Sequence, residues 1–282
     1  MSDRDQKKDK EFNLVRLLTI LFLPFVALSI GQNGFLGLLP FVREAFSLSR
    51  VQIGYYSTSF FVSAMLLAIF TGSIVDRLGP KKSMLLGIGS MGVLLVLHGL
   101  TPNYGILLTI AFLAGIGFSI ITPSVTKGVM QATSREKRGM AMGITQTGFG
   151  IGGIAGASLL PLLGEIFGWR IAIQVAGIFV VLMVPLVYWF YQEHNHIKDF
   201  YAFPEKETKK PPSLWANLYS IFKHKTLFHL NLMAFIFGMS EGAVLSHFMV
   251  FLTGDLGMSK VTAGLDFSTL HLGGMIGLIG WG

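Results

Sequence analysis

Four ionisable side chains lie inside long apolar stretches of the sequence, where a charge is costly. Glu241 and His247 share one stretch, and Asp266 and His271 lie in the next. At the centre of a bilayer an acid or base costs about 2.5–3.5 kcal/mol even on the milder scales, so such groups usually pair, titrate or face a polar cavity. A carboxylate and an imidazole on neighbouring helices could share a proton, so we expect Glu241, with His271 or Asp266, to take up and release protons. Glu241, His247 and His271 are predicted contacts of a polar ligand; a structural hydrogen bond is the alternative for Glu241.

Amide side chains interrupt two other apolar stretches. Gln32 and Asn33 stand between Gly31 and Gly34, and Gln146 lies in a later glycine-rich stretch. Amides beside glycine can bind a polar solute next to exposed backbone, or they can form hydrogen bonds between helices. We predict a ligand-binding role for Gln32, Asn33 and Gln146, with interhelical hydrogen bonding as the alternative.

Nothing in the sequence is typical of a catalytic, metal or cofactor site. The chain contains no cysteine, which excludes disulfides, thiolate ligands and cysteine nucleophiles. No Ser-His-Asp set, cluster of metal ligands or phosphate-binding loop stands out. We therefore expect no enzyme activity, no metal and no cofactor. The net charge of +7 is distributed between apolar runs and not over one basic face, so nucleic acid is not an expected partner.

The apolar residues form runs long enough to cross a membrane. Hydrophobic residues make up 52% of the 282-residue chain and charged residues 13%, about half the charged share of a soluble domain. A helix needs about 20 apolar residues to cross the hydrocarbon layer of a bilayer. We predict an all-α integral membrane protein in which Pro40 closes the first span and residues 164–170 form a turn. The predicted spans lie near residues 14–39, 51–74, 83–101, 104–130, 139–163, 170–191, 226–252 and 261–282.

The basic residues are distributed unevenly between the two ends of these spans. Of the 22 Lys and Arg residues, only Arg43, Arg50, Arg170 and Lys260 fall at the end opposite the N-terminus. Connections rich in Lys and Arg stay on the cytoplasmic side of a membrane. We therefore predict a multi-pass protein of the plasma (inner) membrane, surrounded by the lipid bilayer, with a cytoplasmic N-terminus. Lys127, near the cytoplasmic end of the fourth span, could attract an anion or extend to the interface.

A charged, proline-containing stretch separates the first six spans from the last two. We predict a cytoplasmic tail at 1–13, a six-helix transmembrane bundle at 14–191, a cytoplasmic linker at 192–225, and the first two helices of a second bundle at 226–282. Within the linker, residues 213–223 could form a short amphipathic helix on the membrane surface. A tether between two bundles is the expected role of the linker, and regulation is the alternative.

The connection after the second span carries glycine and charged residues at characteristic spacings. It includes Gly72, Asp76, Arg77, Gly79, Lys81 and Lys82. This pattern resembles the signature of the major facilitator superfamily, which lies in the cytoplasmic loop between that family's second and third spans. The basic loop at 135–138 and the turn at 168–170 resemble the same family. In the fifth span Gly148, Gly152 and Gly156 recur every fourth residue, which lets another helix backbone approach closely.

The resemblance implies a gating role for the charged connection. Asp76 and Arg77 would hold the two halves of the protein together in its outward-facing state, and Asp76 could also cap a helix or pair with Arg77. Gly72 would allow close helix approach and Gly79 a tight turn. The complete predicted gating motif comprises Gly72, Asp76, Arg77, Gly79, Lys81, Lys82 and Arg138.

A weak internal repeat links the two halves of the chain. Residues 49–54 (Ser-Arg-Val-Gln-Ile-Gly) align with residues 259–264 (Ser-Lys-Val-Thr-Ala-Gly) at an offset of 210. Internal repeats are common in secondary transporters. On this pattern the eighth span is the counterpart of the second, and a protein of six plus six spans would need about four more. The sequence is therefore expected to be a fragment, with a six-helix first bundle and two helices of a truncated second bundle.

These observations together predict a transporter. We expect secondary active transport of a small polar or anionic metabolite by alternating access, through proton-coupled symport or exchange, in a monomer. Export of a drug or metabolite by proton antiport is the alternative within transport, and a membrane sensor or receptor is the alternative outside it. Two departures from the family's drug exporters disfavour export by proton antiport. Ala111 stands where those exporters have an arginine, and Gly156-Ala157 stands where they have Gly-Pro.

Overall fold

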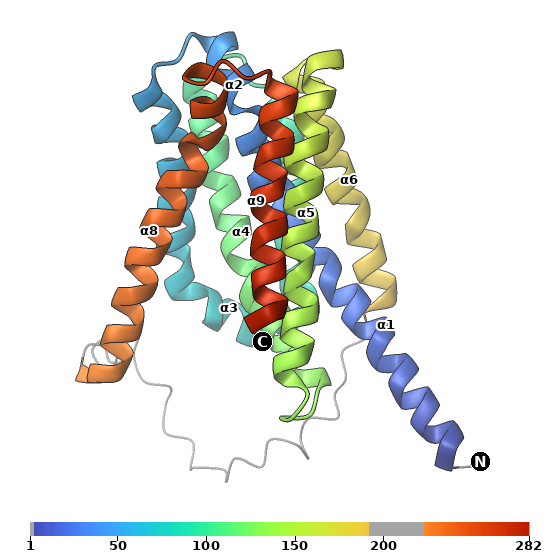
Figure 1. The fold of residues 1–282 in the computed structure, drawn as a ribbon. Helices are drawn as coiled ribbons and strands as arrows, with labels where there is room; N and C mark the ends of the chain where they lie inside the picture. Colours follow the sequence, from blue (N-terminus) through green and yellow to red (C-terminus); the bar gives the residue numbers. More distant parts are fainter. Residues whose placement is uncertain (1–2, 192–222, 282) are drawn as a thin grey trace. The chain divides into compact units, whose positions relative to one another are not determined.

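The computed structural model describes residues 3–191 and 223–281, and the secondary structure within those ranges is helical. The predicted all-α architecture is therefore confirmed for this part of the chain (Figure 1). All but the last three residues of the predicted linker, and nearly all of its predicted amphipathic helix, lie outside the described ranges. The helices are α1 (Asp3–Ser29), a π-helix (Ile30–Gly34), α2 (Phe35–Phe46), α3 (Arg50–Gly99), α4 (Tyr104–Ala132), α5 (Arg138–Phe167), α6 (Trp169–Phe190), α8 (Lys225–Gly254) and α9 (Lys260–Trp281).

In the described part of the chain, six stretches of helix are long and apolar enough to cross a membrane. One of them is α3, whose 50 residues contain the predicted second and third spans. A kink at Gly79, with φ 80° and ψ 162°, divides α3 into two helices. Few side chains other than glycine adopt this φ, so the turn between the two spans depends on Gly79. Helix α9 covers the predicted eighth span, although it is not one of the six stretches.

The chain divides into two units, and each is described by itself. The first unit comprises Met1–Glu193 and His247–Gly282, and therefore contains α1 to α6, the end of α8 and all of α9. The second unit is His194–Ser246, whose described part is residues 223–246. Many large apolar side chains of both units are exposed, as expected for surfaces that face lipid.

The first membrane-spanning segment continues past Pro40, contrary to prediction. Pro40 lies inside α2, and the chain leaves the helix only at Ser47, which has φ 52°. There the Leu48 N–H donates to the Arg43 carbonyl at 2.9 Å, a bond typical of a helix C-terminus. Proline within a membrane helix is tolerated because neighbouring groups can satisfy the freed carbonyl. Likewise, residues 164–167 are helical, so the predicted turn at 164–170 shrinks to Gly168.

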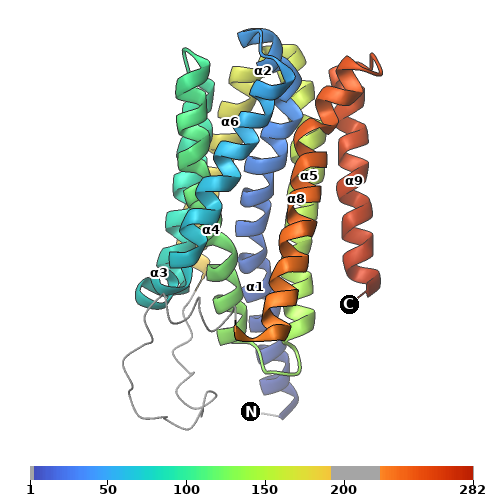
Figure 2. The same cartoon turned by 90° about the vertical axis from the view of Figure 1, so that its left-hand side faces the viewer.

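Helix α5 packs against α1 through the predicted glycine stripe. A Cβ atom added at Gly156 would lie 3.0 Å from the Cα atom of Gly34, and one added at Gly152 would lie 3.0 Å from the Cα atom of Val26. The two backbones are thus nearly in contact, which only small residues permit. Ala157 and Gly153 lie on another face of α5, which packs against α9 (Figure 1). Helices α3 and α4 lie side by side in the same unit (Figure 2).

Polar caps fix the ends of the helices at the end of the first unit that we expect to face outside, called the outer end below. The side chain of Ser49 accepts a hydrogen bond from the Gln52 N–H and the Gln52 side chain accepts one from the Ser49 N–H, which forms a capping box at the start of α3. Arg170 donates to the carbonyl of Thr101 at 2.6 Å and to that of Gly99 at 3.2 Å. The guanidinium therefore satisfies carbonyls at the C-terminus of α3.

Candidate functional site

The predicted amide motif forms the π-helix that joins α1 to α2. Asn33 is fully buried and donates to the Ser29 hydroxyl at 2.9 Å, while its Oδ1 atom has no partner within the described ranges. Gly31 faces the side chain of Met91, and Gly34 faces the side chain of Leu160. The two glycines therefore allow tight packing of α1 between α3 and α5. In this conformation their backbone is covered, whereas the sequence predicted backbone exposed to a solute. A π-helical turn inside a helix is often found at functional sites.

Gln32 lines a small cavity between α1–α2 and α3. The cavity holds about 10 Å³, the space of roughly one water molecule. The buried Oε1 atom of Gln32 and the buried Oγ atom of Ser57 have no hydrogen-bond partner among the described residues. Both residues line the cavity, and its other lining residues, mostly aromatic, are Leu36, Tyr56, Phe60 and Phe61. A polar acceptor, a hydroxyl and aromatic rings therefore meet in one place.

Tyr56 is held in the wall of this cavity by a buried histidine. Its hydroxyl oxygen lies 3.0 Å from His98 Nε2, and His98 Nδ1 lies 2.7 Å from the Leu94 carbonyl. Because a carbonyl only accepts, Nδ1 carries the proton, so in the neutral ring Nε2 accepts from the Tyr56 hydroxyl. The Tyr56 ring also stacks on Phe35 with 4.3 Å between centroids. His98 itself is only 1% exposed, and the hydrogen bonds of both its ring nitrogens give it a structural role.

His271 lies on the other side of α5 from the π-helix. It is 8% exposed, its ring is 5.0 Å from that of Phe267, and its Nε2 atom has no partner within the described ranges. A Cβ atom added at Gly153 would lie 2.8 Å from the imidazole, so the absence of a side chain at Gly153 makes room for the ring. Gly152, the neighbouring residue of α5, faces Val26 and Ser29. His271 therefore packs at Gly153 of α5, whereas Gly34 of the amide motif packs at Gly156, on another face of the same helix.

The other predicted ligand contacts, and Asp266, which was predicted to exchange protons, are distributed over three helices. Gln146 is exposed on α5, four residues from Gly150, which faces Met275 of α9. This spacing places Gln146 on the stripe of α5 that faces α9. Asp266 is half-buried on α9, and His247 is exposed near Gly54 of α3. Glu241 is exposed on the part of α8 that belongs to the second unit, which is described by itself.

The predicted gating motif makes contacts within the first half of the chain. Lys127 Nζ lies 2.7 Å from the carboxylate of Asp76 and also donates to the Val75 carbonyl at 3.3 Å. Asp76 therefore pairs with Lys127 of α4, and not with Arg77 as one prediction had it. Lys127, predicted either to attract an anion or to extend to the interface, forms an ion pair here. A Cβ atom added at Gly72 would meet no atom within 4 Å, so the predicted close helix approach is absent from this conformation.

The remaining basic residues of this motif also contact the first bundle. The ammonium of Lys81 lies 5.0 Å from the centre of the Tyr188 ring, a cation–π contact between α3 and α6. Arg138 donates to the Met130 carbonyl at the end of α4, at 3.4 Å. These contacts tie the connections between helices of the first bundle to one another.

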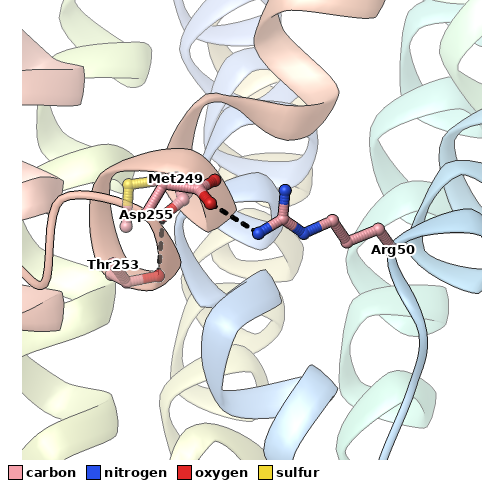
Figure 3. A network of polar contacts seen from close by, with 4 residues as sticks. All are labelled: Arg50, Met249, Thr253 and Asp255. Atoms are coloured by element: carbon pink, nitrogen blue, oxygen red, sulfur yellow. Dashed lines mark hydrogen bonds and ion pairs between the residues drawn. The ribbon is translucent and has the colours of Figure 1, made fainter.

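Two ion pairs join the first and last parts of the chain at the outer end. Arg50 Nη2 lies 2.6 Å from Asp255 Oδ1, as Figure 3 shows. Lys260 Nζ lies 2.5 Å from Glu44 Oε2. An open pocket of about 770 Å³ lies beside the second pair, and its other charged lining residues are Arg43 and Glu165.

Sequence reasoning missed several residues that line the small cavity. Ser57 was overlooked because a single serine in an apolar span usually donates to its own helix backbone, as Ser63 does to the Phe60 carbonyl at 2.9 Å. A signal was present in the spacing: Tyr56 and Phe60 stand four residues apart on one face of α3, and Ser57 and Phe61 do the same. Only the position of Gln32 opposite them shows that these residues line a cavity.

Comparison with known proteins identifies the family. A family model described as Major Facilitator Superfamily matches residues 21–282. The chain belongs to this superfamily. A solved structure of a bacterial homolog of the human lysosomal transporter Spinster, in an inward-facing and unoccupied conformation, has the same fold, with a TM-score of 0.70 and 18% identity over 93% of this chain and 59% of that one. The family that the resemblance of residues 72–82 predicted is therefore confirmed.

Curated members of this superfamily that resemble the chain are named as transporters. A gallate transporter of Pseudomonas putida is 25% identical over 64% of this chain and 40% of its own length. A benzoate transport protein of Acinetobacter baylyi is 27% identical over 53% of this chain and 33% of its own length. Others are named as a probable sulfoacetate transporter and as multidrug resistance proteins. The chain thus spans less than half the length of these two aromatic-acid transporters.

Proposed function

We propose that the full-length protein is a secondary active transporter that moves a small organic anion across the plasma membrane by alternating access, coupled to protons. The N-terminus and the gating motif would face the cytoplasm, as the distribution of Lys and Arg favours. The proposed substrate class is supported by the cavity between α1–α2 and α3 and by the names of the relatives.

The observation that carries this proposal is the meeting of unpartnered polar atoms and aromatic rings in that cavity. Gln32 Oε1 can accept a hydrogen bond from a hydroxyl group, and the Ser57 hydroxyl can donate one to a carboxylate. Phe60 and Phe61 offer ring surfaces to an aromatic substrate. Gallate, which names one relative, carries hydroxyl groups, a carboxylate and an aromatic ring. Benzoate, which names another, carries a carboxylate and an aromatic ring. Because the cavity is small in this conformation, α1 and α3 must separate for such a molecule to bind.

The proposed proton coupling rests on groups of the second half. The imidazole of His271 has a nitrogen with no partner among the described residues, and as a cation it would attract an anion. Glu241 is the proposed partner in proton exchange. An ionisable group near the middle of a membrane helix is costly, so its presence there indicates a function. Lys127 is less suited to attract the substrate, since Asp76 occupies its ammonium group.

A pair of serine substitutions tests the proposed site. In the full-length transporter Ser57→Ala should raise the KM for gallate or benzoate uptake by about twofold to tenfold, the effect of one lost neutral hydrogen bond, and leave kcat nearly unchanged. The matched control is Ser63→Ala, since Ser63 is equally buried on α3 but bonds to its own helix. Equal KM values for both variants would contradict the assignment of Ser57.

Efflux by proton antiport is the second candidate function. Two relatives named as multidrug resistance proteins of Bacillus subtilis, 30% and 26% identical, favour it. The two candidates differ in the direction in which a proton gradient drives the substrate, so a measurement of flux under an imposed gradient separates them.

A further inference from the structure

The two ion pairs at the outer end occupy equivalent positions in the internal repeat. Ser49 accepts from the Gln52 N–H at the start of α3, and Ser259 accepts from the Thr262 N–H at the start of α9. These serines stand 210 residues apart, as do the basic residues that follow them, Arg50 and Lys260. The sequence repeat therefore corresponds to a repeat of local structure, in which each half presents a base in the first turn of its second spanning segment.

Each base pairs with an acid from the opposite half. Arg50, from the first half, pairs with Asp255, which directly follows α8. Lys260, from the second half, pairs with Glu44 in the last turn of α2. In each half the acid precedes the base by five or six residues. The arrangement is reciprocal, because each half contributes one acid and one base.

The stability of the individual helices does not explain these charges. A helix dipole disfavours a cation at the N-terminus and an anion at the C-terminus. Arg50 and Lys260 lie in first turns, whereas Glu44 and Asp255 lie in or just past last turns. All four charges therefore oppose the dipoles of their own helices. Their arrangement becomes favourable only when the two halves meet and the pairs form.

We infer that these two pairs form an outer latch, which holds the first and second halves together and closes the outer side of the transporter. This inference rests on the proposed alternating access and on the proposed orientation. The side chains are partly exposed, at 57% and 36% for Arg50 and Asp255 and 22% and 67% for Lys260 and Glu44, so each bond is weak and reversible. A latch of two weak pairs suits a transporter that must open this side in every cycle.

The state of the inner end agrees with this assignment. The family resemblance implies that Asp76 holds the two halves together in the outward-facing state. Here its carboxylate is instead bound to Lys127 of its own half. The ion pairs that connect the two halves thus lie at the outer end in the described part of the first unit. The conformation is therefore one in which the outer latch is closed and Asp76 is held within the first half.

Charge-reversal variants of the full-length protein test the latch. Ser57→Cys, below the outer end of α3, would report access to a membrane-impermeant maleimide added outside intact cells. Arg50→Asp or Asp255→Arg should raise the labelling rate by roughly twofold to fivefold or more, since an exposed pair is lost and replaced by repulsion. The double variant with both changes should label at the parent rate. The same cycle with Lys260→Glu and Glu44→Lys tests the second pair independently.

The outcomes distinguish the latch from the transport proposal. Labelling requires no substrate, so the cycle is informative even if uptake of organic anions is never observed. Pro102→Cys, exposed in the connection between α3 and α4, should label rapidly from outside and verifies the orientation. Equal rates for the parent and for all reversal variants would overturn the latch. A double variant that labels as fast as its single variants, at equal expression, would show that the two residues do not act as a pair.

Discussion

At the scale of single residues, two buried histidines have different surroundings. His98 bonds through both ring nitrogens, to Tyr56 and to the Leu94 carbonyl, and so is satisfied as a neutral structural group. His271 is nearly as buried, but its Nε2 atom has no partner in the described ranges. A buried polar atom without a partner is costly, and in a transporter a ligand or a proton can provide the partner. His271 is therefore the histidine that we assign to function.

Removal of the proposed proton-binding groups should uncouple transport from the pH gradient. His271→Gln and Glu241→Gln, made separately in the full-length protein, keep polar side chains but remove groups that exchange protons. We expect each variant to lose uptake driven by the pH gradient. Each should still let the substrate move down the substrate's own concentration gradient. The measurement is uptake into vesicles with and without an imposed pH gradient.

The matched control for these variants is His229→Gln. His229 is exposed and its ring contacts the carbonyl of Lys225 on its own helix. This variant should transport like the parent. Gradient-driven uptake that persists in both His271→Gln and Glu241→Gln would remove these residues from the coupling mechanism.

At the scale of helices, glycine decides which backbones meet. Gly156 meets Gly34 of the π-helix, whereas Gly153 leaves room for His271 on α9. One helix thus carries two packing faces, and each face positions a part of the proposed site. Because the contacts are backbone to backbone, the helices have little freedom to adjust to an added side chain.

A methyl group on the first face should destabilise the bundle. In Gly156→Ala the new Cβ atom would lie 3.0 Å from both the Cα and N atoms of Gly34, so backbone must shift. Overpacking of this kind costs about 1–3 kcal/mol. The control is Gly143→Ala on the same helix, where a Cβ atom meets nothing within 4 Å. Thermal unfolding in detergent should show a lower Tm for Gly156→Ala and an unchanged or slightly higher Tm for Gly143→Ala; equal Tm values would contradict the packing described for α5.

The sequence allowed prediction of helix positions but not of helix partners. Apolar length determines the spans, and the glycine at position 79 determines the turn between the second and the third. These predictions agree with the structure to within a few residues. The exceptions are the end of the first span, predicted at Pro40, and the end of the fifth, predicted just before Gly164. The stripe of α5 was also predictable, because its spacing is a local property. In contrast, the pairing of Asp76 with Lys127 and the cavity shared by Gln32 and Ser57 depend on contacts between distant segments. Such contacts leave no periodic signal in one sequence.

At the scale of the whole molecule, the capped start of α9 in the second half repeats that of α3 in the first. The capped segments at Ser49 and Ser259 start equivalent spans, and the bases that follow them reach across to the opposite half. The proposed substrate contacts lie on helices of the first half, and the proposed proton-binding groups lie on helices of the second. A relative movement of the halves would therefore change the position of the proton-binding groups relative to the substrate contacts, which coupled transport can use.

The most direct test of the account is net flux of an organic anion under an imposed proton gradient. The full-length protein would be reconstituted in vesicles with the pH lower outside, and uptake of radiolabelled gallate or benzoate would be followed with and without a protonophore. The account predicts accumulation above the external concentration, which the protonophore abolishes. Uptake that never exceeds equilibration, or expulsion of the anion driven by the same gradient, would contradict it.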